Sequence, residues 1–113
     1  MNKYNILIAE FMGYKPGWYD HGINGIKRIY INDAISKGYY KSPEEFDYHR
    51  DWNSLMEVVD KIEGLGFPVQ IKRHECLIQR PPDEYWIRHA LPGQLKLQSV
   101  YKAVVEFIEK EDR

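Results

Sequence analysis

The sequence predicts an α+β fold in which a small, mainly antiparallel sheet packs against amphipathic helices. Apolar residues recur at intervals of three and four in three separate segments, and this spacing places them on one face of a helix. Between the second and third segments, apolar and polar residues alternate as they do in a half-buried strand. No repetition of strand, helix and strand occurs, so the pattern does not indicate a dinucleotide-binding fold.

The first helical segment spans residues 2–13. Gly13 is suited to its C-terminal end, because glycine readily adopts the left-handed conformation that ends many helices. A buried strand over residues 4–9 is the alternative, since the apolar run is short enough for either structure. The residues that share the helical face are Tyr4, Leu7, Ile8, Phe11 and Met12.

Residues 14–41 show no helical period, and an unstructured loop of that length is unusual in a compact domain. Asn24 and Gly25 predict a tight hairpin turn, because both residue types tolerate the positive φ angles that such a turn requires. The flanking strands are then residues 18–23 and 26–31.

Two short helical turns are expected after the hairpin. Asp33 is placed to cap the first, which ends near Gly38. The second begins at Ser42, with Pro43 at the first helical position and Glu45 three residues after the cap, the arrangement of a capping box.

The central helix is predicted over residues 52–64. Asp51 is a suitable N-cap, and Gly64 and Gly66 end the helical pattern. Polar residues lie mostly off the apolar stripe, as they do on a helix with one buried face. The stripe consists of Trp52, Leu55, Met56, Val59 and Ile62.

Strands are predicted for much of the remaining chain. Residues 67–74 alternate between apolar and polar side chains, and residues 76–79 form a second strand that the prolines at 81 and 82 end. Residues 85–89 form a third short strand. The last helix covers residues 95–110, and its stripe is Leu97, Val100, Tyr101, Val104 and Ile108.

The composition indicates a single globular domain over residues 1–113. Lysine and arginine number 16 against 17 aspartates and glutamates, and this balance gives no strong long-range field toward nucleic acid or membrane. Cys76 is the single cysteine, so an intrachain disulfide is excluded and a cytoplasmic location is expected. The N-terminal apolar run is short and Glu10 interrupts it, unlike a signal peptide, and no run is long enough to span a membrane.

Three stretches of the chain resemble a known family. They are IAEFMG at 8–13, YHRDWNSLMEVVDKIEGLG at 48–66 and YKAVVEFIE at 101–109. Together they resemble small uncharacterised proteins of phages, prophages and gut bacterial genomes that share the phage α-β-α sandwich domain. The resemblance implies a phage or mobile-element origin and an α-β-α sandwich-like architecture. It implies no reaction and supplies no functional residues.

The same stretches also have a structural interpretation. Their apolar residues lie on the predicted helical faces, so we expect them in the core. The chain departs from the family pattern at Arg50, Asp51 and Glu57, all at polar positions that do not affect the predicted fold. The expected core residues are Phe11, Met12, Trp52, Leu55, Met56, Tyr101, Val104 and Val105.

No motif of the chain carries a reaction mechanism, and no cofactor or metal site is predicted. His74 and Cys76 are two residues apart, but a metal site requires three or four ligands. Cys76 with His74 or His89 is the one combination that a thiolate enzyme would use. The favoured interpretation of Cys76 is a small buried apolar residue, so the protein is expected not to be an enzyme.

The aromatic residues of segment 14–41 predict a binding surface for an unknown protein partner or for a second copy in a homodimer. Tyrosine and tryptophan are favoured at interfaces because they bury a large area and keep a polar tip. The alternative is that these rings pack the hairpin onto the helices. The hypothetical anchors are Trp18, Tyr19, Tyr39 and Tyr40.

A single-stranded nucleic-acid binder is the second functional hypothesis. Residues 68–104 contain six basic and three acidic residues, a small local excess of positive charge. Lys72 and His74 share one strand face, and Trp86 and Arg88 share another. Cations and an aromatic ring on the face of a sheet can bind single-stranded nucleic acid, because the cations attract its phosphates and the ring stacks on its bases.

Overall fold

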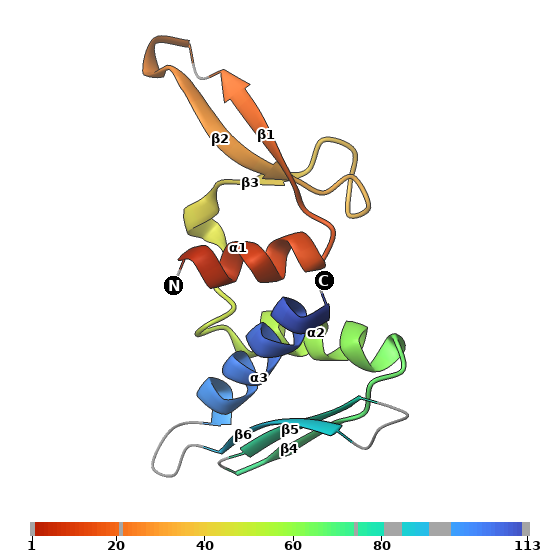
Figure 1. The fold of residues 1–113 in the computed structure, drawn as a ribbon. Coiled ribbons are helices and arrows are strands. Elements are labelled where there is room, and N and C mark those ends of the chain that lie inside the picture. The colour runs from red at the N-terminus through yellow and green to blue at the C-terminus, as the bar shows by residue number, and fades with distance from the viewer. Residues whose placement is uncertain (1, 21, 74, 81–84, 91–95, 112–113) are drawn as a thin grey trace. The chain divides into compact units, whose positions relative to one another are not determined.

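The computed structural model describes residues 2–20, 22–73, 75–80, 85–90 and 96–111. The chain forms two compact units, Met1–Asp47 and Tyr48–Arg113, each with helices and a three-stranded antiparallel sheet (Figure 1). The α+β class is confirmed. The expectation of a single sheet is wrong, because the strands of each unit pair with one another in the orders β1-β2-β3 and β4-β5-β6.

The first unit begins with helix α1 (Asn2–Phe11), so the alternative of a strand at this position is wrong. Ile8 and Ala9 are buried, as is Asn5, whose side-chain Nδ2 donates to the backbone oxygen of Phe46 at 3.0 Å. Gly13 has a φ of 103°, and the backbone N–H that follows it, of Tyr14, donates to the Ala9 oxygen. The helix therefore ends on a left-handed glycine, as its sequence predicts.

Strands β1 (Lys15–Asp20) and β2 (Ile26–Ile31) form the predicted hairpin, with Trp18 directly opposite Arg28. The two-residue turn is wrong, because Asp20 pairs with Ile26 and a short 3-10 helix, η1 (Gly22–Asn24), lies between the strands. The first strand also begins earlier than expected, at Lys15.

The third strand of this sheet, β3 (Tyr40–Lys41), was not predicted, because two residues are too few to show a period. It pairs Lys41 with Tyr30 of β2. The helical turn expected after Asp33 does not form; residues 33–38 make turns, and the Asp33 carboxylate accepts from the Gly38 N–H at 2.9 Å. This side chain closes a loop instead of capping a helix.

The helical turn η2 (Pro43–Glu45) completes the first unit and agrees with the sequence prediction. The Glu45 carboxylate accepts from the backbone N–H of Ser42 at 2.7 Å, which is one half of a capping box. Within the unit, Phe46 packs edge-on against Tyr14, with ring centroids 4.9 Å apart, and edge-on against Tyr30.

Helix α2 (Trp52–Gly64) opens the regular structure of the second unit, and both its ends agree with the prediction. The Asp51 carboxylate accepts from the backbone N–H groups of Asn53 and Ser54, so the predicted N-cap is confirmed. Leu55 is buried, but the expectation that Trp52 lies in the core is wrong, since 39% of it is exposed. Trp52 is the first residue of the helix and so lies at the end of the apolar stripe.

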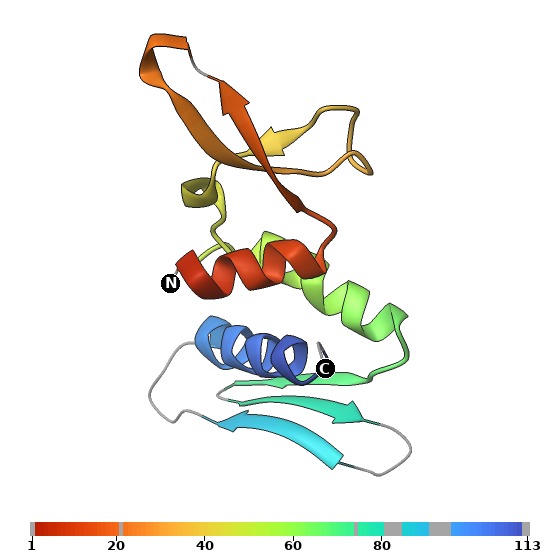
Figure 2. The same ribbon diagram turned by 45° about the horizontal axis from the view of Figure 1, so that its top comes forward.

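Strands β4 (Val69–Lys72), β5 (Glu75–Arg80) and β6 (Tyr85–Ala90) form the second sheet, and helix α3 (Lys96–Glu111) lies across one face of it (Figure 2). All four elements were predicted. Helix α2 contacts α3 and β4, and Phe67 packs edge-on against Phe107.

The expected core residues of the three family-like stretches are buried to different degrees. Those of α3 and one of α2 are buried, namely Leu55, Tyr101, Val104 and Val105. Phe11, Met12 and Met56 are half-buried.

Candidate functional site

The candidate binding surface lies on the β1–β2 hairpin and on β3. We call it the aromatic hairpin surface and define it by Trp18, Tyr19, Arg28 and Tyr40. Trp18 is 65% exposed, Tyr40 45% and Tyr19 43%. Because neighbouring residues of a strand point to opposite faces, Trp18 and Tyr19 present their rings on the two sides of the hairpin.

One side of the hairpin combines a cation with an aromatic ring. The Arg28 guanidinium lies 5.3 Å from the centroid of the Trp18 ring and 5.7 Å from that of Tyr30. The strand register produces this contact, since Trp18 and Arg28 are directly opposite each other. The stacked guanidinium leaves much of the indole open to solvent, where both groups can contact a partner.

The other side carries two stacked tyrosines. The rings of Tyr19 and Tyr40 have centroids 5.4 Å apart and planes inclined by only 18°. Tyr40 belongs to β3 and Tyr19 to β1, so the pair spans the sheet across β2. Rings that are already ordered lose little conformational entropy when a partner covers them.

The other rings of segment 14–41 are covered within the first unit. Tyr14 and Tyr30 are buried against Phe46. Tyr39, the fourth predicted anchor, is half-buried and its ring centroid lies 6.4 Å from that of Tyr14. Some rings of this segment therefore pack within the first unit and others are exposed, and the binding role of the exposed rings stays a prediction.

Exposed residues of the hairpin that were not among the predicted anchors include Arg28 and Ile26 of β2. Ile26 is 69% exposed. The signal was present, since both lie at alternate positions of the predicted strand, but only the register shows that Arg28 meets Trp18.

A cavity of about 640 Å³ adjoins the same surface. Its lining consists of residues 27–29 of β2, Tyr40 of β3 and residues 42–45. It lies where β3 ends and the chain turns into η2, so β2 forms one wall and η2 another. The lining carries Lys27 and Arg28 on one wall and Glu44 and Glu45 on the other.

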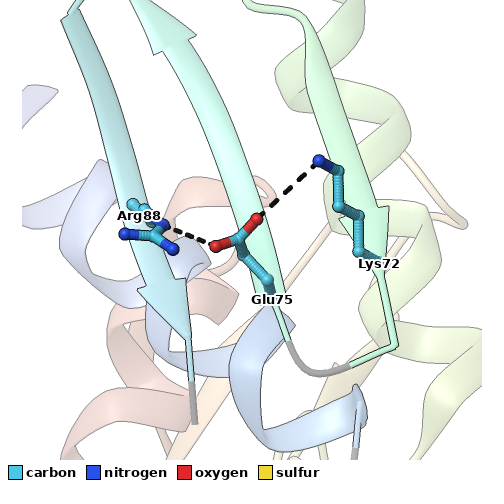
Figure 3. A network of polar contacts seen from close by, with 3 residues as sticks. All are labelled: Lys72, Glu75 and Arg88. Atoms are coloured by element: carbon cyan, nitrogen blue, oxygen red, sulfur yellow. Dashed lines mark hydrogen bonds and ion pairs between the residues drawn. The ribbon is translucent and has the colours of Figure 1, made fainter. Parts of the chain in front are cut away.

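The predicted nucleic-acid residues lie in the second unit. Lys72 and Arg88 both contact Glu75, which lies between them on β5 (Figure 3). Lys72 Nζ is 3.9 Å from one carboxylate oxygen, and Arg88 Nε donates to the other. A single carboxylate therefore offsets part of the positive charge that would attract a phosphate.

The other two residues of that hypothesis are His74 and Trp86. His74 lies outside the described residues. Trp86 pairs with Gln79 in the ladder between β5 and β6, and its side chain lies outside the described part of the structure.

Cys76 lies on the helix-covered face of the second sheet, directly opposite His89. The thiol is buried, and this burial raises its pKa to about 12. The attacking species of a cysteine enzyme is the thiolate, which a pKa so far above neutrality makes scarce. His89 Nε2 instead lies 3.4 Å from the Glu106 carboxylate of α3.

The part of the chain that the structure describes also contains no cluster of metal-ligand residues and no helix suited to span a membrane. No three histidine, cysteine or carboxylate residues among the described ones gather closely enough to hold a metal ion. None of the helices in these ranges combines the length and the apolar character that a bilayer span requires.

Comparisons of the chain with protein-family models, with curated proteins and with solved structures found no match. The resemblance to the phage α-β-α sandwich domain proteins stays a prediction.

Proposed function

We propose that this protein is a non-enzymatic binding module of phage or mobile-element origin that binds a protein through the aromatic hairpin surface. The observation that carries the proposal is that Trp18 and Tyr19 of the hairpin and Tyr40 of β3 are exposed on one sheet, beside a guanidinium stacked on the indole. The origin rests on the resemblance of the three sequence stretches, and a cytoplasmic location rests on the single cysteine.

The chemistry of the surface supports a protein partner. Tryptophan, tyrosine and arginine are the residue types that dominate the energy of protein interfaces. Trp18 and Tyr40 each expose a large apolar area, and covering it would contribute favourably to binding. Segment 14–41 contains five basic and two acidic residues, so the surface also favours a partner with negative charge.

The proposal is tested by capture from the cells that carry the gene, with the bound proteins quantified by mass spectrometry. We compare the wild type with Trp18→Ala and Tyr40→Ala, and Trp52→Ala is the matched control because it removes an exposed ring from α2. A partner should bind the wild type and the control alike and fall at least about tenfold with the hairpin variants. Equal capture by all four proteins would contradict the proposal.

Self-association is the second form of the same proposal. Light scattering after size exclusion should then give the mass of a dimer for the wild type and of a monomer for Trp18→Ala. A wild type that is monomeric at high concentration excludes the homodimer and leaves a different protein as the partner.

Single-stranded nucleic-acid binding remains the alternative, favoured by the position of Lys72 and Arg88 on the two outer strands, β4 and β6, of one sheet. Fluorescence anisotropy with labelled oligonucleotides at low salt tests it, because phosphate contacts are strongest there. If the alternative holds, Glu75→Gln should strengthen binding, since it frees both cations. No binding at low salt would end it.

A further inference from the structure

Four of the six residues of strand β2 have no neighbouring strand on one side in the part of the chain that the structure describes. β1 pairs with the whole of β2, from Ile26 to Ile31, but β3 pairs only with Tyr30 and Ile31. After Lys41 the chain continues into η2, which contacts β2 but does not pair with it as a strand. Among the described residues, the stretch 26–29 is therefore a free sheet edge on the β3 side.

The backbone groups of this edge have a definite direction. The Asn32 N–H donates to the Tyr39 oxygen, so the backbone of Asn32 points to the β3 side. In an antiparallel strand both groups of a residue point to one side, and the side alternates along the chain. Arg28 and Ile26 thus direct their N–H and C=O groups toward the free edge, beyond the end of β3.

There is space beside this edge. The cavity of about 640 Å³ is lined by residues 27–29 and, opposite them, by residues 42–45. A free strand edge next to an open groove is the arrangement to which an extended peptide adds as a further strand, because backbone hydrogen bonds hold it and side-chain contacts select it.

We propose that an extended, acidic segment of another protein adds as a strand to the edge of β2 at residues 26–29. The charges favour acidic side chains, since Lys27 and Arg28 are consecutive and thus present a cation on each face of the edge. Glu44 and Glu45 lie on the η2 side of the groove, so the acidic residues of the ligand belong at the end near the hairpin loop.

A second copy of this chain is disfavoured as the occupant of the edge. If two β2 edges paired antiparallel about a two-fold axis, residues near the axis would meet their own equivalents. Pairing centred on Lys27 opposes two ammonium groups, and pairing centred on Arg28 opposes two guanidinium groups. Like charges directly opposite each other destabilise a sheet.

This inference rests on the proposed function and specifies how the partner is bound. A strand added beside β2 contacts Arg28 on one face of the sheet and Tyr40, which lines the groove, on the other. Trp18 and Tyr19 lie on β1, on the other side of β2, so the added strand reaches the aromatic hairpin surface through Arg28 and Tyr40.

The test uses a display library of random peptides of about ten residues, long enough for one strand, selected against the intact protein. We expect recovered peptides to be rich in aspartate, glutamate and β-branched residues. Synthetic copies are then measured against variants by fluorescence anisotropy. A library that yields no peptide, or yields neutral or basic ones, overturns the inference.

Ile26→Pro removes one edge N–H without removing a bond to β1, and proline is tolerated at the first residue of a strand. It should weaken peptide binding about tenfold, because the peptide loses one backbone hydrogen bond to the edge. Ile26→Val keeps the N–H and is the matched control. Equal binding by the two variants contradicts strand addition.

Charge reversal provides a test that does not alter the backbone. The double variant Lys27→Glu and Arg28→Glu should lose the acidic peptides and select basic ones from the same library. Unchanged selection would overturn the inference.

If binding of the captured partner is weakened by Trp18→Ala but not by Ile26→Pro, the strand-addition mode fails and the proposed function stands. If neither substitution matters, both fail.

Discussion

The two sheets of this protein differ in the residues that they leave uncovered. In the second unit, α3 lies over one face of the sheet and buries Cys76, Ile78 and Ile87. The residues exposed beyond it include Lys72 and Arg88, which are polar and contact Glu75.

The first unit leaves aromatic and aliphatic residues uncovered. Its sheet buries Ile29 and Tyr30 toward the base of the hairpin, while Trp18 and Ile26 are exposed along it. The hairpin extends beyond β3, and apart from η1 in its own loop no helix among the described residues of this unit lies over its end (Figure 1). An exposed sheet face is thus ordinary when its side chains are polar and paired, and it indicates a binding surface when they are large and apolar.

The largest expected effect on stability comes from a substitution in the core of the second unit. Phe107 is fully buried and its ring centroid lies 4.9 Å from that of Phe67. Phe107→Ala should lower the free energy of unfolding by about 3–5 kcal/mol, because it leaves a cavity under α3. Urea denaturation followed by circular dichroism measures this loss. Trp52→Ala is the control and should cost far less; equal losses would mean that α3 does not form the core.

The next effect concerns pH. Burial raises the pKa of the Cys76 thiol to about 12, above its ordinary value of 9.0, so the unfolded chain loses this proton first. Stability is therefore complete below pH 9 and falls as the pH rises toward 12, by about 2 kcal/mol near pH 10.5. Denaturation at both ends of this range measures the fall. The free energy of unfolding of Cys76→Ala should fall less over the same pH range. A fall equal to that of the wild type would contradict the burial of the thiol.

In the first unit, the buried amide of Asn5 tests whether this smaller core depends on a polar contact. Asn5→Leu removes the amide that donates to the Phe46 carbonyl and should lower the free energy of unfolding by roughly 1–2 kcal/mol. Thermal denaturation of the variant measures the loss, with Lys3→Ala as an exposed control on the same helix. A neutral Asn5→Leu would show that apolar packing alone holds α1.

The cap of α2 should have a smaller effect. Asp51→Ala removes the acceptor for the backbone N–H groups of Asn53 and Ser54 and should cost about 1 kcal/mol. Asp60→Ala, an exposed carboxylate within the same helix, should be close to neutral. If both variants lose the same stability in urea denaturation, charge and not capping is responsible.

The smallest effect on stability belongs to the residue expected to matter most for binding. Trp18→Ala should change the free energy of unfolding by about 0.5 kcal/mol, the contribution of an exposed cation–π contact with Arg28. A loss as large as that of Phe107→Ala in the same assay would mean that Trp18 serves the fold and would remove the contrast between the two units.

Much of the fold was predictable because the deciding interactions are local. Asp51 before α2 and Gly66 after it lie within a few residues of the backbone groups that they serve, so both ends of that helix agree with the prediction. The strands of the second sheet followed from their alternation. By contrast, β3 is too short to show a period, and the turn before β2 depended on a register that the residues Asn24 and Gly25 did not determine.

The candidate site was predictable only in part. Three of the four predicted anchors are exposed, but Tyr39 is half-buried beside Tyr14. The aromatic content of segment 14–41 showed that rings were numerous, and it could not show which of them Phe46 would cover. That outcome depends on contacts between residues far apart in the chain.

The sequence by itself determined the three α-helices, the N-cap of α2, the alternating strands and the class of the fold, because these follow from hydrogen bonds and periodicities within short windows. Only the tertiary structure decided that the strands form two sheets, that Arg28 stacks on Trp18, and that residues 26–29 remain an open edge. Register and coverage are set by non-local pairing, and a single residue of register changes which face of a strand is exposed.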